Sequence, residues 1–122
     1  MPRILVIDDE ASVQRALRRL LQHSGHDVTL AASGEEGLAA LETGAYDVIL
    51  SDMRMPNLDG PSFYRELAHR QPHLLPRVVF LTGDVLSAEA DAFFAQAECP
   101  RLIKPFKGQE VRRIIQQVLE AQ

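Results

Sequence analysis

Charged side chains follow directly on three short apolar runs of this chain. Residues 4–7 are followed by Asp8 and Asp9, and residues 102–103 are followed by Lys104. Residues 48–50 are followed, after one serine, by Asp52. If the runs are neighbouring parallel strands, their carboxyl ends meet at one edge of a sheet and the four groups share one pocket. Mg²⁺ prefers carboxylate and phosphate oxygens, and lysine binds phosphate as a compact charge. The pattern therefore indicates chemistry on a phosphoryl group beside a divalent cation.

The charges of such a pocket support the same interpretation. Three carboxylates at close range repel one another, so at least one pKa rises unless a cation is present. One Mg²⁺ ion and Lys104 together balance the three negative charges. Thr82 follows another apolar run and offers a hydroxyl to the same oxygens, and Gly83 permits close approach of the backbone.

The rest of the chain alternates between strand-like and helix-like segments that can position these groups. The expected strands are residues 3–7, 28–30, 47–50, 77–81 and 101–103. The expected helices carry apolar residues from Val13 to Leu21, at residues 34–42, after Pro61, at 87–97 and from Val111 to Leu119. Gly25 suits a left-handed position at the end of the first helix. This alternation predicts an α/β fold, with a five-stranded parallel sheet and helices on both faces.

Composition narrows the class of protein. The chain has 122 residues with a net charge of -4, which suits a single domain over residues 1–122 and argues against direct nucleic-acid binding. Its apolar runs fall short of the ~20 residues of a membrane span, and no export signal is visible at the start. The only cysteine, Cys99, cannot form an internal disulfide and has no neighbour that would lower its pKa. We therefore expect an inert thiol and a cytoplasmic location.

Each candidate residue also has an ordinary structural explanation. Asp9 or Glu10 could cap the first helix, Lys104 with Pro105 could form a surface turn, and Thr82 could end a strand. Their joint occurrence at four strand ends favours the pocket.

In its motifs the chain resembles response-regulator receiver domains of bacterial two-component signalling, over essentially its whole length. The matching segments, in order, are Val6 to Glu10, Ser51 to Pro56, Leu58 to Gly60, Leu81 to Gly83 and Lys104 to Phe106. The resemblance implies a flavodoxin-like sheet with strand order 2-1-3-4-5, which is the order of the chemotaxis regulators in this family.

The resemblance also implies roles for these residues. Asp52 would accept a phosphoryl group from the histidine of a sensor kinase or phosphotransfer protein. Asp8, Asp9 and Asp52 would hold Mg²⁺ together with the backbone carbonyl of Arg54.

Two further residues complete the set that the resemblance implies. Lys104 would bond the phosphoryl group and Thr82 would move toward it. The Lys104–Pro105 peptide bond would be cis.

The function expected from this resemblance is a phosphorylation-dependent switch that changes binding to a downstream protein. The chain would promote only its own phosphorylation and dephosphorylation, and the face of its last helix could form a homodimer. Whether it stands alone or belongs to a larger regulator or hybrid kinase stays open. A Mg²⁺-dependent phosphohydrolase with an aspartyl-phosphate intermediate is the alternative, although its two acids would lie two residues apart, whereas Asp8 and Asp9 are adjacent. A receiver that serves only as a scaffold is a third possibility, which the intact pocket residues disfavour.

Two positions depart from the family pattern. Arg101 stands where many receivers have an aromatic residue that rotates inward. Because burying an unpaired arginine is costly, we expect Arg101 on the surface, where its loss affects partner binding more than phosphorylation. A charge pair between Arg54 and Asp84 could slow hydrolysis of the acyl phosphate; two solvated side chains are the alternative.

Overall fold

A single parallel sheet forms the centre of the molecule. The computed structural model describes residues 1–83, 88–97 and 99–122. The strands are β1 (Arg3–Ile7), β2 (Asp27–Ala31), β3 (Val48–Asp52), β4 (Val78–Thr82) and β5 (Arg101–Ile103). They lie in the order β2-β1-β3-β4-β5, and all four pairings are parallel. The predicted fold class and strand order are confirmed.

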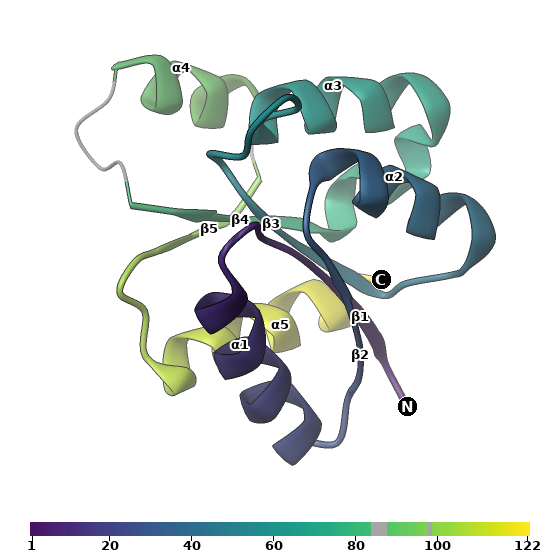
Figure 1. Ribbon diagram of the computed structural model, residues 1–122, viewed down its shortest axis with the longest axis vertical. Helices are drawn as coiled ribbons and strands as arrows, with labels where there is room; N and C mark the ends of the chain where they lie inside the picture. The colour runs from purple at the N-terminus through teal and green to yellow at the C-terminus, as the bar shows by residue number, and fades with distance from the viewer. Residues whose placement is uncertain (84–87, 98) are drawn as a thin grey trace.

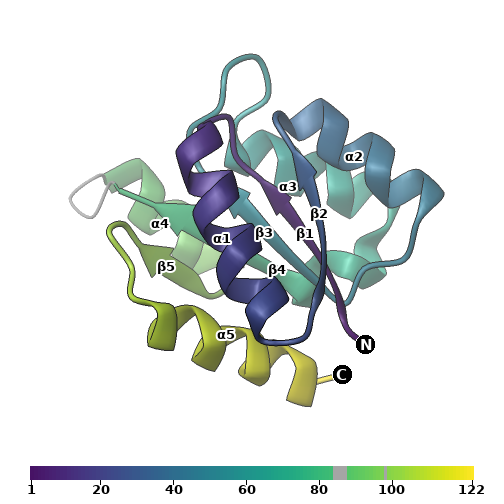
Figure 2. The ribbon, with the colours of Figure 1, turned by 60° about the horizontal axis from the view of Figure 1, so that its bottom comes forward.

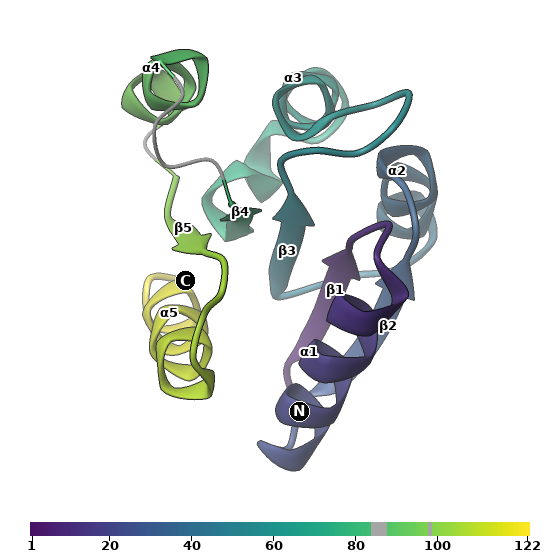
Figure 3. The same cartoon turned by 60° about the vertical axis from the view of Figure 1, so that its left-hand side comes forward.

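Helices cover both faces of this sheet (Figure 1). They are α1 (Ala11–His23), α2 (Gly34–Thr43), α3 (Gly60–Arg70), α4 (Ala88–Ala97) and α5 (Gly108–Glu120), with a 3-10 helix η1 (Pro72–Arg77). In Figure 1, α2, α3 and α4 lie above the sheet, and α1 and α5 lie below it. The end-on view of Figure 3 shows the same three layers. None of the described helices has the length and apolar character needed to cross a bilayer.

Each face of the sheet has its own apolar core. Alternate residues of β1 point to opposite faces, so Leu5 and Ile7 pack with α2 and α3, whereas Ile4 and Val6 pack with α1 and α5. All four side chains are fully buried. Burial on both faces explains why β1, β3 and β4 consist largely of consecutive apolar residues in the sequence.

An aromatic cluster fills the core beneath α3 and α4. Phe80 of β4 is fully buried, and its ring centroid lies 5.9 Å from that of Tyr64, 5.3 Å from Phe93 and 5.9 Å from Phe94. The tilted and edge-on geometries of these pairs are those that aromatic quadrupoles favour. The cluster joins α3 and α4 to the sheet.

The loop after β3 requires a glycine where α3 begins. A Cβ on Gly60 would lie 2.8 Å from Met53 Cα and 3.0 Å from a ring carbon of Phe80. Asp59 caps this helix, because its carboxylate accepts the Ser62 N–H. The short turn therefore packs directly against the residue that follows Asp52.

A few elements differ from their predicted bounds. β3 continues through Asp52 rather than ending at residue 50, and β4 covers 78–82 rather than 77–81. The helix η1 was not predicted, since its two prolines and short length give no helical period. Residue 87, the predicted start of the fourth helix, lies outside the described residues. Gly25 has φ of 89°, which confirms its left-handed position.

Cys99 packs against the core beneath α3 and α4, and burial raises the pKa of its thiol to about 11 from 9.0. At pH 8 the thiolate fraction falls about 100-fold for such a change, and the thiolate is the reactive species. We expect iodoacetamide to alkylate the folded protein at least about 50-fold more slowly than the urea-unfolded chain. Mass spectrometry of timed samples measures both rates; similar rates would show that Cys99 is open to solvent.

Candidate functional site

The carboxyl ends of the strands bring together side chains from distant parts of the chain. Asp8 follows β1, Asp52 ends β3 and Lys104 follows β5. The Lys104 Nζ atom lies 3.3 Å from Asp8 Oδ2 and 3.5 Å from Asp52 Oδ1. The two carboxylates and the amine therefore form one charged centre.

The two carboxylates of this centre are buried. Asp8 is 0% exposed and Asp52 is 5% exposed. Asp8 Oδ1 accepts the Glu10 N–H at 2.9 Å, and Asp52 Oδ1 accepts the Arg54 N–H at 3.5 Å. These bonds orient both side chains at the point where their strands end.

Burial dominates the ionisation of the site. Burial raises the pKa of Asp8 against the opposing effects of the Glu10 N–H and Lys104. Burial also raises the pKa of Asp52, and the charge of Asp8 raises it further. For Lys104 burial acts to lower the pKa, but the charges of Asp52 and Asp8 outweigh it and the net shift is upward. One amine thus compensates the buried negative charge only in part.

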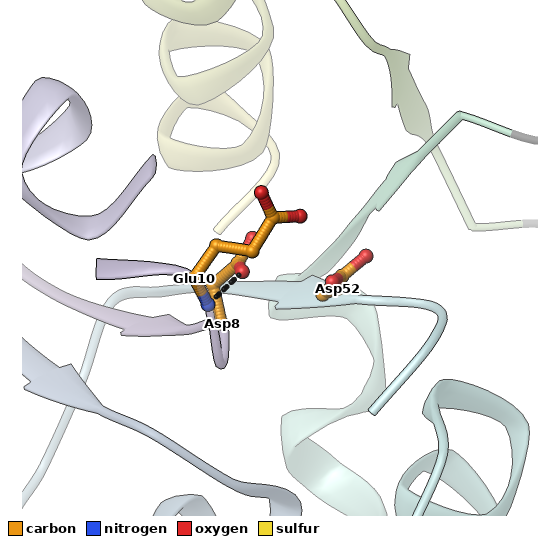
Figure 4. A group of neighbouring side chains, drawn as sticks. All are labelled: Asp8, Glu10 and Asp52. Atoms are coloured by element: carbon orange, nitrogen blue, oxygen red, sulfur yellow. Dashed lines mark hydrogen bonds between the residues drawn. The ribbon is translucent and has the colours of Figure 1, made fainter. Parts of the chain in front are cut away.

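Glu10 is the functional candidate that sequence reasoning missed. It is the N-cap residue of α1, yet its side chain makes no capping bond. Its Oε1 atom lies 3.7 Å from Lys104 Nζ. Carboxylate oxygens of Asp8, Glu10 and Asp52 all lie within 4.8 Å of one another (Figure 4). In the sequence, only the position of Glu10 directly after two aspartates could have indicated that its carboxylate joins this acidic cluster.

An open cavity of about 460 Å³ lies over this centre. Its lining residues are Asp9, Glu10, Asp52, Met53, Arg54, Gly83 and Lys104. Asp9, the predicted third carboxylate, is exposed and lines the cavity but is absent from the close cluster of acids. Thr82 is 2% exposed and lines an adjoining hollow of about 180 Å³ that shares Met53 and Arg54 with the cavity.

Backbone hydrogen bonds between neighbouring strands continue one residue beyond the strand ends. Asp8 N–H donates to Ala31 O at 3.0 Å, Met53 N–H to Leu81 O at 3.0 Å, and Lys104 N–H to Thr82 O at 2.7 Å. The Lys104–Pro105 peptide bond is cis, as the resemblance implied. The three loops that carry the site therefore start from fixed backbone positions.

Comparison with known proteins defines the class of this molecule. The sequence matches the response regulator receiver domain family over residues 4–116. It is 35% identical over 121 residues to the sensor kinase CckA of Brucella abortus, and 33% identical over 116 residues to the DNA-binding transcriptional regulator NtrC of Salmonella typhimurium. These matches cover 98% and 95% of this chain, but only 13% and 24% of the relatives.

Solved structures agree with this assignment. The chemotaxis protein CheY4 of Vibrio cholerae superposes with a TM-score of 0.88 at 29% identity, covering 98% of this chain and 99% of that one. The receiver domain of the sensor histidine kinase PA1611 of Pseudomonas aeruginosa has a TM-score of 0.87 at 32% identity, with 98% of each chain covered. That structure has a magnesium ion coordinated in its active-site cleft.

The chain belongs to the response regulator receiver domain family. Receiver domains act as regulatory phosphoacceptors and pair with histidine kinases or phosphotransfer proteins. The function class that follows is a phosphorylation-dependent switch of two-component signalling.

Arg101 lies on the surface, as expected. Its guanidinium stacks 4.6 Å from the ring centroid of Phe94 and lies 3.4 Å from Asp91 Oδ1, so it joins β5 to α4. The pairing of Arg54 with Asp84 stays a prediction, because Asp84 lies outside the described residues.

Arg101→Ala should leave labelling by a small phosphodonor within about twofold of the parent, because the Arg101 guanidinium contacts Phe94 and Asp91 of α4 rather than the charged centre. Loss of an exposed ion pair and a cation–π contact should cost about 1–2 kcal/mol of unfolding free energy, measured in urea. Arg112→Ala, an exposed arginine on α5, is the control. A large drop in labelling would contradict a surface role for Arg101.

Proposed function

We propose that Asp52 accepts a phosphoryl group from a phosphohistidine of a sensor kinase or phosphotransfer protein. The supporting observation is the position of its carboxylate, buried at the base of an open cavity with the Lys104 amine 3.5 Å away. In the transfer, a bond forms between Asp52 Oδ and phosphorus while the bond from phosphorus to the donor imidazole nitrogen breaks. The electron pair stays on that nitrogen.

Phosphoryl transfer is accelerated mainly by positioning and by neutralising charge. Lys104 supplies a donor that can follow the phosphoryl oxygens, since it already lies between Asp8 and Asp52. The Thr82 hydroxyl lies at the end of the neighbouring strand and offers one more donor. Lys104 and Thr82 together would bind the oxygens of the phosphoryl group on Asp52 at this edge of the sheet.

Mg²⁺ is the cofactor in this proposal. The oxygens of Asp8, Glu10 and Asp52 converge within 4.8 Å, and a cluster of hard carboxylate oxygens suits this cation. Asp8, Asp9 and Asp52 with the backbone carbonyl of Arg54 are the proposed ligands, and Glu10 is a further candidate. The bound ion would neutralise charge on the phosphoryl oxygens.

The output of the switch is a change in affinity for a downstream protein. We propose that residues 1–122 act as one receiver domain and that this domain works in the cytoplasm. We also propose that it self-associates through α5. The domain would catalyse only its own phosphorylation and dephosphorylation.

Incubation with Mg²⁺ and acetyl phosphate tests the proposal. We expect intact-mass spectrometry to show the gain of one phosphoryl group, peptide mapping to locate it on Asp52, and chelation of Mg²⁺ to prevent it. No labelling, or labelling elsewhere, would overturn the proposal. Sustained turnover of p-nitrophenyl phosphate would instead support the phosphohydrolase alternative.

A further inference from the structure

The outer face of α1 carries a cluster of arginines. Arg15, Arg18 and Arg19 are exposed and, together with Gln22 and His23, line a surface hollow of about 460 Å³. We call these five residues the α1 arginine face. Figure 2 shows α1 in the foreground, with no other helix over its outer side. The face is therefore open to a partner.

The arginines of this face have no acidic neighbour on their own helix. Residues 11–23 include no aspartate or glutamate, so α1 cannot form stabilising ion pairs between its own positions i and i+4. Within the part of the chain that the structure describes, no carboxylate forms an ion pair with Arg15, Arg18 or Arg19.

Some arginines elsewhere on this surface form ion pairs with carboxylates. Arg70 lies 2.9 Å from both Glu42 and Glu66, and Arg101 lies 3.4 Å from Asp91. Among the described α-helices, α1 alone carries arginines and no acid, since α3 contains Glu66 and α5 contains Glu110 and Glu120. The net charge of -4 did not indicate it, because acids on other elements outnumber these arginines.

We propose that the α1 arginine face binds a protein segment that presents carboxylates at one-turn spacing. The positions from 15 to 23 span about 12 Å along the helix at 1.5 Å per residue, which matches two to three turns of a partner helix. Arginine is well suited to this partner, because its planar guanidinium binds carboxylates through two parallel hydrogen bonds.

Nucleic acid fits this face less well. Binding of a duplex commonly uses about 6–10 phosphate contacts, whereas this face offers three arginines on a chain of net charge -4. The inference does not depend on Asp52 accepting a phosphoryl group, since the face lies outside the pocket that contains Asp52.

An alanine-based helical peptide with glutamates at positions i, i+4 and i+7 is the probe. Titration followed by amide chemical shifts should show saturable binding at low salt, with the largest shifts in α1. A peptide with glutamine at the same positions should bind at least about tenfold more weakly. Equal binding of the two peptides, or shifts centred on another element, would overturn the proposal.

Matched charge reversals locate the interaction. Arg18→Glu/Arg19→Glu should weaken binding of the glutamate peptide at least about tenfold, because attraction becomes repulsion. Arg65→Glu/Arg113→Glu makes the same charge change at exposed arginines outside the face and should weaken binding less than about threefold. Equal weakening by both variants would show a non-specific charge effect, and tighter binding of duplex DNA than of the peptide would show a nucleic-acid surface; either result overturns the proposal.

Discussion

Asp52→Asn is expected to abolish labelling by acetyl phosphate, because the asparagine amide cannot form the acyl phosphate. The packing of the pocket should survive, since asparagine has the size and shape of aspartate. Intact-mass spectrometry with and without Mg²⁺ measures the effect. Asp27→Asn is a matched control, because Asp27 is an exposed aspartate on β2 that forms an ion pair with Arg3 outside the pocket. Residual labelling of Asp52→Asn would show that another residue accepts the phosphoryl group.

The same variant should be more stable than the parent when no metal is present. Burial raises the pKa of Asp52 in the folded chain above 3.8, its value when exposed, so the folded state favours the protonated carboxyl. The metal-free parent therefore loses stability as the pH rises through the interval between these two values, and regains it as the pH falls. At neutral pH the full cost is present, and Asp52→Asn removes it.

Thermal unfolding at pH 7 in EDTA measures this gain. A Tm rise of about 3–5 °C is expected for each kcal/mol in a domain of this size. As the pH falls toward 3.8, the ordinary pKa of an aspartate, the parent should approach the stability of the variant. Added Mg²⁺ should stabilise the parent more than the variant, because the variant has lost one carboxylate. A variant less stable than the parent in EDTA would show that the bond to Lys104 outweighs burial.

Among the substitutions proposed here, Phe80→Ala is expected to cause the largest loss in the free energy of unfolding. The ring is fully buried at the centre of the cluster formed with Tyr64, Phe93 and Phe94. Truncating a buried phenylalanine costs about 3–5 kcal/mol, because transfer free energy is lost and a cavity remains. A domain with only about 5–15 kcal/mol of stability would lose a large share of it. Urea unfolding followed by circular dichroism measures the difference.

Phe93→Ala provides a graded comparison within the same cluster. Phe93 is only partly buried, so its truncation should cost clearly less than that of Phe80. If the Phe93 variant were the less stable of the two, the energy of the cluster would reside between α3 and α4 rather than against the sheet.

The sequence was sufficient to predict the elements whose burial gives a clear period. α1 and α5 bury one stripe each, so their apolar residues recur at helical spacing, and β1, β3 and β4 are buried on both faces. The order of the strands came from resemblance, because periodicity carries no information about which strands are neighbours. The 3-10 helix η1 is too short to show a period and was missed.

The candidate site shows where sequence reasoning ends. Asp8, Asp52 and Lys104 could be predicted because each follows an apolar strand that ends at the same edge of the sheet. Glu10 could not, since a carboxylate at the start of a helix can cap its own backbone or cross to another segment. Only tertiary structure decides, and here it turns Glu10 toward Lys104.

Hydrogen bonds between neighbouring strands continue beyond the ends of β1, β3 and β5, and this affects ligand exchange at the site. Separating the backbone at Asp8, Met53 or Lys104 would break bonds that belong to the sheet itself. If Asp52 accepts a phosphoryl group beside a cation as proposed, we expect both to exchange by rotation of side chains while the main chain at these three residues stays in place. We therefore expect phosphorylation and dephosphorylation to require no partial unfolding of the domain.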